Sequence, residues 1–210
     1  MPPVIRSAYM NREKTAKIFK SPILEALTKT HWSIPLFIFL PFIGYLVWIS
    51  IHSTLSVPIT FGLMAIGVFF WTFAEYFLHR FVFHFEPKSK IGKNIHFFIH
   101  GIHHDYPQDA KRLVIPPFAS ALTAVLFYFG FEAVLGTLYT PPFFAGFVAG
   151  YLYYDLLHYT LHHATIRGKW LKALKHQHMQ HHFNNPQSTY GVSTQIWDRL
   201  FGSLSDRPHE

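Results

Sequence analysis

The chain contains no cysteine among its 210 residues. This absence excludes disulfides, thiolate zinc sites, cysteine-ligated iron–sulfur clusters and a cysteine nucleophile. Any bound metal must therefore be held by nitrogen or oxygen. The 16 histidines outnumber the 11 acidic residues, so imidazole nitrogen is the donor that the composition favours.

Charge is also scarce. Only 14% of the residues are charged, whereas about 25% is usual in soluble domains. No Asp, Glu, Lys or Arg lies between Lys29 and Glu75, and Glu132 alone lies between Arg112 and Asp155. A nucleic-acid-binding protein would spread its basic residues over a folded surface. Here the net charge is +7, and the basic residues flank the charge-free blocks. This pattern is typical of a membrane protein and argues against a nucleic-acid partner.

Each charge-free block is too long for one membrane span, which needs about 20 residues. Residues 52–54 with Pro58 predict a turn inside the first block, and residues 140–142 predict one inside the second. The sequence therefore predicts an all-α fold with a four-helix membrane anchor made of two hairpins and a helical cap. The expected spans are residues 32–51, 57–78, 118–138 and 143–161.

The basic residues fall on one side of this plan. Segments 1–31, 79–117 and 162–210 each hold six of the 18, and the two turns hold none. The positive-inside rule then predicts a multi-pass protein with both termini and both histidine-rich segments in the cytoplasm. The membrane would be the endoplasmic reticulum in a eukaryote and the inner membrane in a bacterium. We expect a basic N-terminal segment at 1–31 and one membrane domain at 32–210.

Ten histidines form four spaced sets: an H-x4-H pair, an H-x2-H-H triplet, an H-x3-H pair and a second H-x2-H-H triplet. Because each pair lies where a predicted span leaves the membrane, all four sets are expected on one membrane face. Histidine is chosen for metal or proton chemistry, so this pattern predicts metal ligands. The ten predicted ligands are His79, His84, His100, His103, His104, His158, His162, His178, His181 and His182.

Spacing indicates how these rings meet. Residues i, i+3 and i+4 share one helix face, so each triplet is expected to converge on one point. His79 and His84 are five apart, which predicts a helix end or a π-type bulge between them. Each half of the chain supplies five histidines. Either each set of five binds its own metal, or the sets are shared between two metals. The remaining six are expected to be non-ligands: His31, His52, His96, His163, His176 and His209.

Five further residues are candidates for supporting roles. Asp155 lies three residues before His158 and is expected to orient that ring, and His163 adjoins His162. Arg112, Asn94 and Tyr159 lie near the sets and are candidates for binding a substrate headgroup. Each of these three is equally explained as an interface anchor.

The chain resembles the fatty acid hydroxylase superfamily, and within it the fatty acid 2-hydroxylase branch, over about residues 65–203. The resemblance rests on the runs WTFAEY, HRFVFH, HFFIHGIHH, RLVIPP, YDLLHY and GVST, and on Trp197-Asp198. It implies two metal ions held by the ten histidines, and O2-dependent hydroxylation at C2 of a long acyl chain, free or in ceramide. Iron is the metal expected for activity, and zinc is a possible bound metal.

Many members of this branch carry a cytochrome b5 domain before the first span, and we expect none here. Electrons would then come from a separate donor, either cytochrome b5-like or ferredoxin-type with a reductase. Two other functions remain open: a carotenoid or sterol hydroxylase or desaturase of the same superfamily, and a non-enzymatic membrane metal-binding protein or transporter.

Overall fold

The computed structural model describes residues 17–205. No strand occurs among these residues, so the all-α prediction is confirmed. The elements in chain order are α2 (Pro22–Leu27), α3 (Ile34–Ile51), α4 (Val57–Leu78), the π-helix η1 (His79–Phe83), α5 (Lys90–His96), the π-helix η2 (Phe97–Gly101), α6 (Ile102–Asp105), α7 (Pro117–His163), α8 (Lys169–Phe183) and α9 (Ile196–Leu200).

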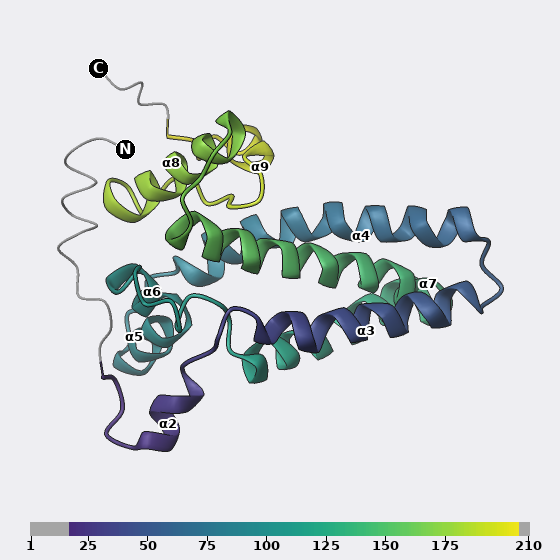
Figure 1. The fold of residues 1–210 in the computed structure, drawn as a ribbon, viewed down its shortest axis with the longest axis horizontal. Helices are drawn as coiled ribbons and strands as arrows, with labels where there is room; N and C mark the ends of the chain where they lie inside the picture. The colour runs from purple at the N-terminus through teal and green to yellow at the C-terminus, as the bar shows by residue number, and fades with distance from the viewer. Residues whose placement is uncertain (1–16, 206–210) are drawn as a thin grey trace.

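Three long apolar helices, α3, α4 and α7, run side by side and form the body of the molecule (Figure 1). Each is long and apolar enough to cross a membrane. Their outer surfaces carry large exposed apolar side chains; Phe37 is 78% exposed, Phe118 82% and Val134 81%. A water-soluble bundle would bury such side chains, whereas lipid accommodates them without cost. The protein is a membrane protein.

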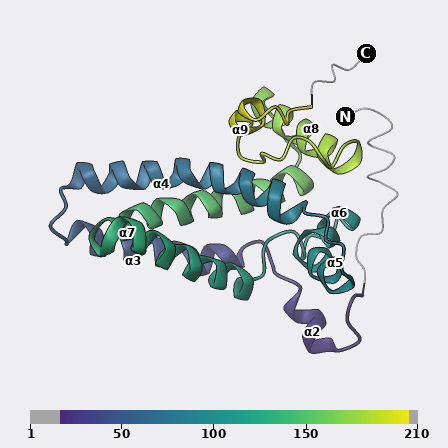
Figure 2. The same cartoon turned by 180° about the vertical axis from the view of Figure 1, so that it is seen from behind.

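Helix α7 is two antiparallel halves joined at Gly136, which has φ 77° and ψ 166°. Phe131 contacts Phe143 at 4.9 Å between ring centroids, and Phe127 contacts Phe147 at the same distance, so the halves pack on each other (Figure 2). The anchor therefore has four spans in two hairpins, as predicted.

The second reversal lies at Gly136 rather than at residues 140–142. Glycine has no Cβ and reaches this backbone conformation without a steric penalty. Pro141 and Pro142 lie instead inside the second half of α7. Both reversals, the turn between α3 and α4 and the one inside α7, lie at the end of the bundle away from α5, α6, α8 and α9 (Figures 1 and 2).

Helices α4 and α7 approach so closely that their backbones touch. A Cβ at Gly67 would lie 2.0 Å from the carbonyl oxygen of Phe143, and one at Gly146 would lie 1.9 Å from that of Met64. Small residues let membrane helices make such contacts, which gain van der Waals packing that a lipid-filled gap would lose. Because α4 leads into His79 and α7 ends at His163, this contact fixes where two histidine pairs lie.

The short helices form a cap over the other end of the bundle. The Trp197 indole N–H on α9 donates to Thr72 Oγ1 on α4 at 3.0 Å, and its ring lies 5.0 Å from that of Phe73. Tyr76 forms a hydrogen bond with Ser203 at 2.9 Å. The C-terminal part of the cap is thus fastened to the last turns of α4.

Replacing Gly146 by Ala is expected to destabilise the bundle by about 1–3 kcal/mol, because the added methyl group overlaps the α4 backbone. Gly62→Ala is the matched control, since nothing lies within 4 Å of a Cβ there. That change is expected to be neutral or stabilising by up to about 1 kcal/mol. Thermal unfolding in detergent, followed by helical circular dichroism, measures both; equal effects would contradict the close contact.

Candidate metal centre

Two sets of five histidines converge where the spans meet the cap. In each set the available ring nitrogens all lie within 4.8 Å of one another. The first set is defined as His79, His84, His100, His104 and His181. The second set is defined as His103, His158, His162, His178 and His182.

A π-helical turn brings the H-x4-H pair together. In η1 the His84 N–H donates to the His79 carbonyl at 3.1 Å, a bond that spans five residues. A regular α-helix would carry His84 away from the face that His79 occupies. With the wider turn, the two ring centroids lie 4.9 Å apart. Of the two predicted alternatives, a helix end or a π-type bulge, the structure has the π-type turn.

The triplets do not converge on single points as predicted. His178 and His182 belong to the second set, whereas His181, between them, belongs to the first. On an α-helix, residues i and i+4 lie about 40° apart, while i+3 lies about 60° to the other side of residue i. His103 is likewise separated from His100 and His104. Each half of the chain thus lends one histidine to the other half's set, which is the shared arrangement left open by the sequence.

Within the first set the Nε2 atoms face one another. The separations are 3.1 Å for His79–His100, 2.9 Å for His100–His104 and 2.9 Å for His84–His181. A metal–imidazole bond is about 2.0–2.1 Å, so two ligands at a right angle have nitrogens about 2.9 Å apart. The observed separations match that spacing.

The second set has the same geometry. Nε2 of His178 lies 2.7 Å from that of His162 and 3.1 Å from that of His182. Nε2 of His103 and of His158 is buried without a hydrogen-bond partner among the described residues. Buried polar atoms are nearly always paired, and a metal ion would satisfy these two.

Burial keeps the imidazoles neutral. It lowers the pKa of His84 to about 3, helped by the nearby His181, and that of His181 to about 4. Burial likewise lowers the pKa of His103 and His178 well below the ordinary value, with smaller contributions from neighbouring histidines. Neutral imidazole is the ligand form, so the residues present fit metal ions.

The two sets adjoin each other. The rings of His104 and His182, one from each set, stack with centroids 4.3 Å apart. No carboxylate belongs to either set within residues 17–205. Ten imidazoles in two adjacent groups are therefore a candidate two-metal centre with nitrogen ligands.

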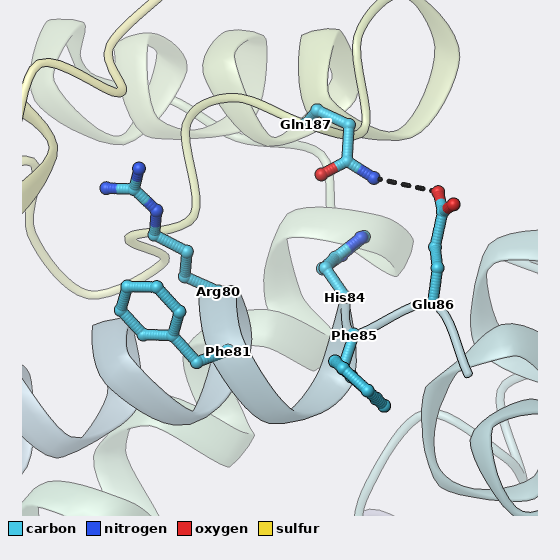
Figure 3. Close-up of a pocket in the computed structure, with 6 residues that line it drawn as sticks. All are labelled: Arg80, Phe81, His84, Phe85, Glu86 and Gln187. Carbon is cyan, nitrogen blue, oxygen red and sulfur yellow. Dashed lines mark hydrogen bonds between the residues drawn. The ribbon is translucent and has the colours of Figure 1, made fainter. Parts of the chain in front are cut away.

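An opening of about 400 Å³ reaches the first set from the surface (Figure 3). Its lining includes Arg80, His84, Glu86 and Gln187. Figure 3 shows the His84 ring between Arg80 and Glu86, with Gln187 Nε2 donating to Glu86 Oε1 at 3.4 Å. His84 is thus the member of the first set that lines this opening.

The profile of the family described as fatty acid hydroxylase matches residues 64–203, the segment that carries all ten histidines. The chain belongs to the fatty acid hydroxylase family. Members of this family are metal-dependent hydroxylases, which accords with two sets of convergent imidazoles.

Known relatives of this hydroxylase include 2-hydroxylases from plants and animals. A dihydroceramide fatty acyl 2-hydroxylase of Arabidopsis thaliana is 39% identical, over 90% of this chain and 79% of its own length. The fatty acid 2-hydroxylase of Homo sapiens is 36% identical, over 92% of this chain and 58% of its own length. The chain thus spans little more than half of the human protein.

A solved structure confirms the fold of this hydroxylase. Full-length scs7p, of which only the hydroxylase domain is visible, superposes with a TM-score of 0.88 at 36% identity. The superposition covers 94% of this chain and 76% of that one.

The predicted supporting residues of the hydroxylase centre have other partners. The carboxylate of Asp155 is buried and accepts from the Ile115 N–H at 3.3 Å and from the Tyr151 hydroxyl at 3.4 Å. These bonds hold the segment before α7 against the second half of that helix. His163 is exposed and lies outside both sets, with its ring 4.7 Å from that of Tyr159.

The three headgroup candidates lie on different elements. Arg112 is buried and forms ion pairs with Glu25 of α2 and with Asp109 at 3.2 Å. Asn94 is exposed on α5. Tyr159 is half-buried, with its ring 5.9 Å from that of Trp32. The contacts of Arg112 favour an anchoring role for α2.

The sequence alone assigns no role to two buried acids near the centre. Glu75 and Asp198 are 3% and 0% exposed, and both accept hydrogen bonds from the backbone between α8 and α9. The only signal in the sequence was their place within the runs shared with the hydroxylases. The backbone groups that donate to Glu75 lie more than a hundred residues away in the chain, so residue spacing could not reveal this contact.

Arg112→Ala is expected to free α2 from the cap, because Glu25 loses its buried partner. The pKa of Glu25 is about 2, lowered first by Lys29 and further by backbone donors and Arg112, so the carboxylate is charged at neutral pH. Limited proteolysis should cut residues 17–31 faster in this variant than in wild type. Lys111→Ala, at an exposed neighbouring position, is the control; equal cutting rates in both variants would contradict the anchoring role.

Proposed function

We propose that this chain is a membrane-bound, O2-dependent hydroxylase that adds a hydroxyl group at C2 of a long-chain fatty acid or of the acyl chain of ceramide. The carrying observation is the pair of adjacent five-imidazole sets at the end of an apolar four-span bundle. The relatives named for fatty acid and dihydroceramide 2-hydroxylation support the substrate class.

The ten histidines of the two sets are proposed to hold two metal ions, one in each set. Iron is the metal proposed for activity, and it would supply the oxidising chemistry needed to break a C–H bond that has no leaving group. Zinc suits the same nitrogen ligands but has no redox chemistry, so a zinc-loaded protein would be inactive.

The chain's own part is to bind and orient the substrate. The acyl chain would lie along the apolar spans, and the cap would keep C2 near the histidines. One oxygen atom of O2 enters the C–H bond, and the other leaves as water after taking up two electrons and two protons. We propose a separate electron donor, either cytochrome b5-like or ferredoxin-type with a reductase.

Topology follows from charge. The histidine-rich end carries Lys88, Lys93, Lys169 and Lys172, whereas the reversals at the opposite end carry no basic residue. The positive-inside rule supports a cytoplasmic centre, in the endoplasmic reticulum or in a bacterial inner membrane. We propose residues 32–210 as the hydroxylase domain, preceded by the basic segment 1–31.

A metal transporter is disfavoured by the position of the histidines. Transport needs polar ligands along a path through the bilayer. Both sets instead gather where the spans meet the cap, at one end of the bundle (Figure 1). A carotenoid or sterol hydroxylase or desaturase would use the same kind of histidine centre. Analysis of the product distinguishes these activities from fatty acyl hydroxylation.

Lipid mass spectrometry on cells that express the chain tests the reaction. Wild type is expected to yield acyl chains one oxygen atom heavier, with the oxygen at C2. His103→Ala is expected to abolish this product while membrane insertion is kept, because the second set loses a buried nitrogen. His163→Ala is the matched control and should keep most of the activity, since that ring lies outside both sets. Full activity in His103→Ala would refute the ligand assignment.

Metal removal tests the same site independently. Dialysis of purified protein against a chelator is expected to abolish hydroxylation, and ferrous iron should restore it whereas zinc should not. Activity that survives complete removal of metal, verified by elemental analysis, would exclude the proposed chemistry.

A further inference from the structure

The loop between α8 and α9 supplies acceptors for two rings of the first set. His181 Nδ1 donates to the Ser188 carbonyl at 2.7 Å, and His79 Nδ1 donates to the Tyr190 carbonyl. A neutral histidine that donates from Nδ1 has a bare Nε2, which is then free to bind a metal. The backbone of this loop, residues 188–193, therefore selects which nitrogen of each ring faces the centre.

Asp198 holds the first part of the 188–193 loop with both of its oxygens. Oδ1 accepts from the Tyr190 N–H and the Ser203 hydroxyl, each at 2.8 Å, and Oδ2 accepts from the Gly191 N–H at 2.7 Å. The residue is 0% exposed. Asp198 therefore fixes the backbone on both sides of Tyr190, whose carbonyl accepts the hydrogen bond from His79.

Glu75 holds the second part with only one oxygen. Its Oε1 accepts from the Val192 N–H at 2.6 Å and from the Ser193 N–H at 2.8 Å. Its Oε2 is buried without a hydrogen-bond partner among residues 17–205. Both oxygens of Asp198 accept hydrogen bonds, whereas Oε2 of Glu75 accepts none from the described residues. Replacing the carboxylate by an amide should therefore affect the two residues differently.

The backbone of the loop has little freedom to take another path. Thr189, between the two acceptor carbonyls, has φ 57°, and its N–H donates to the Ser203 carbonyl at 2.7 Å. A Cβ at Gly191 would lie 2.0 Å from the Thr194 carbonyl oxygen and 2.8 Å from Asp198 Oδ2. A non-glycine residue with positive φ persists only where its surroundings hold it.

We propose that Asp198 and Glu75 are positioning residues for the first set, acting through the 188–193 loop, and that the two metal positions are therefore not equivalent. Both rings for which the loop supplies acceptors, His79 and His181, belong to the first set. In the second set, the buried Nδ1 of His182 has no hydrogen-bond partner among the described residues. Loss of the loop's support should weaken one metal position and spare the other. This inference rests on the proposed two-metal function.

The test compares the same change, carboxylate to amide, at the two acids. Asp198→Asn places an amide NH2 against a backbone N–H or the Ser203 hydroxyl, since both oxygens of Asp198 are in use. Glu75→Gln keeps the accepting oxygen and places its NH2 where Oε2 has no partner. Glu75→Met removes the acceptor altogether. Ferrous iron binding to each full-length variant is measured anaerobically, with elemental analysis giving ions per chain.

Wild type should bind two ions per chain. Asp198→Asn and Glu75→Met should keep one ion at wild-type affinity and bind the other about 10- to 100-fold more weakly, the usual effect of removing a partner that orients a ligand. Glu75→Gln should behave as wild type. His181→Ala is the reference for damage confined to the first set, and the iron spectrum of Asp198→Asn should match it.

Equal weakening of both ions, or wild-type affinity for both in Asp198→Asn and Glu75→Met, would overturn the inference. A Glu75→Gln variant that matches Glu75→Met would do the same. If Asp198→Asn fails to fold, as judged by helical circular dichroism, the Glu75 pair decides alone. A wild-type protein that binds no iron would instead refute the proposed function, so the two failures are distinguishable.

Discussion

Backbone contact between α4 and α7 is the constraint on which the centre depends. Gly67 and Gly146 let the two helices touch along the middle of the bundle. Water does not drive helix association inside a bilayer, so close packing must supply the attraction. From this contact α4 continues into His79, and the second half of α7 continues to His158 and His162. Three ligand candidates are thus placed by a packing interaction within the spans.

Gathering and burying the histidines costs folding free energy, because buried ring nitrogens without partners lose their hydrogen bonds to water. Within the described part of the chain, ten imidazoles are gathered with no carboxylate among them, and the buried Nε2 atoms of His103 and His158 have no hydrogen-bond partner. Burial favours the neutral form, which lowers the pKa of His84 and His181 into the acidic range. A bound cation would stabilise such a set of neutral, convergent nitrogens, so we expect folding of the cap to be coupled to metal binding.

The cap does more than cover the histidines. The 188–193 loop contacts α4 through Glu75, and Trp197 on α9 donates to Thr72 of the same helix. The same loop receives Nδ1 of His79 and of His181, which lie on different helices. Gln187, directly before the 188–193 loop, also lines the opening beside His84 (Figure 3). The segment between α8 and α9 therefore both supplies acceptors to two rings of the first set and contributes to the opening beside His84.

The sequence by itself determined the all-α membrane fold, the four sets that contain the ten histidines, and a break in the regular helix between His79 and His84, as either a helix end or a π-type turn. These follow from local rules: span length, charge placement and helical period act over a few residues. Only the tertiary structure decided which histidines meet. The exchange of His103 and His181 between the two halves depends on contacts between segments far apart in the chain, and so do the contacts of Glu75 and of Arg112. Residue spacing carries no information about such contacts, because they arise from how packed helices place their ends in space.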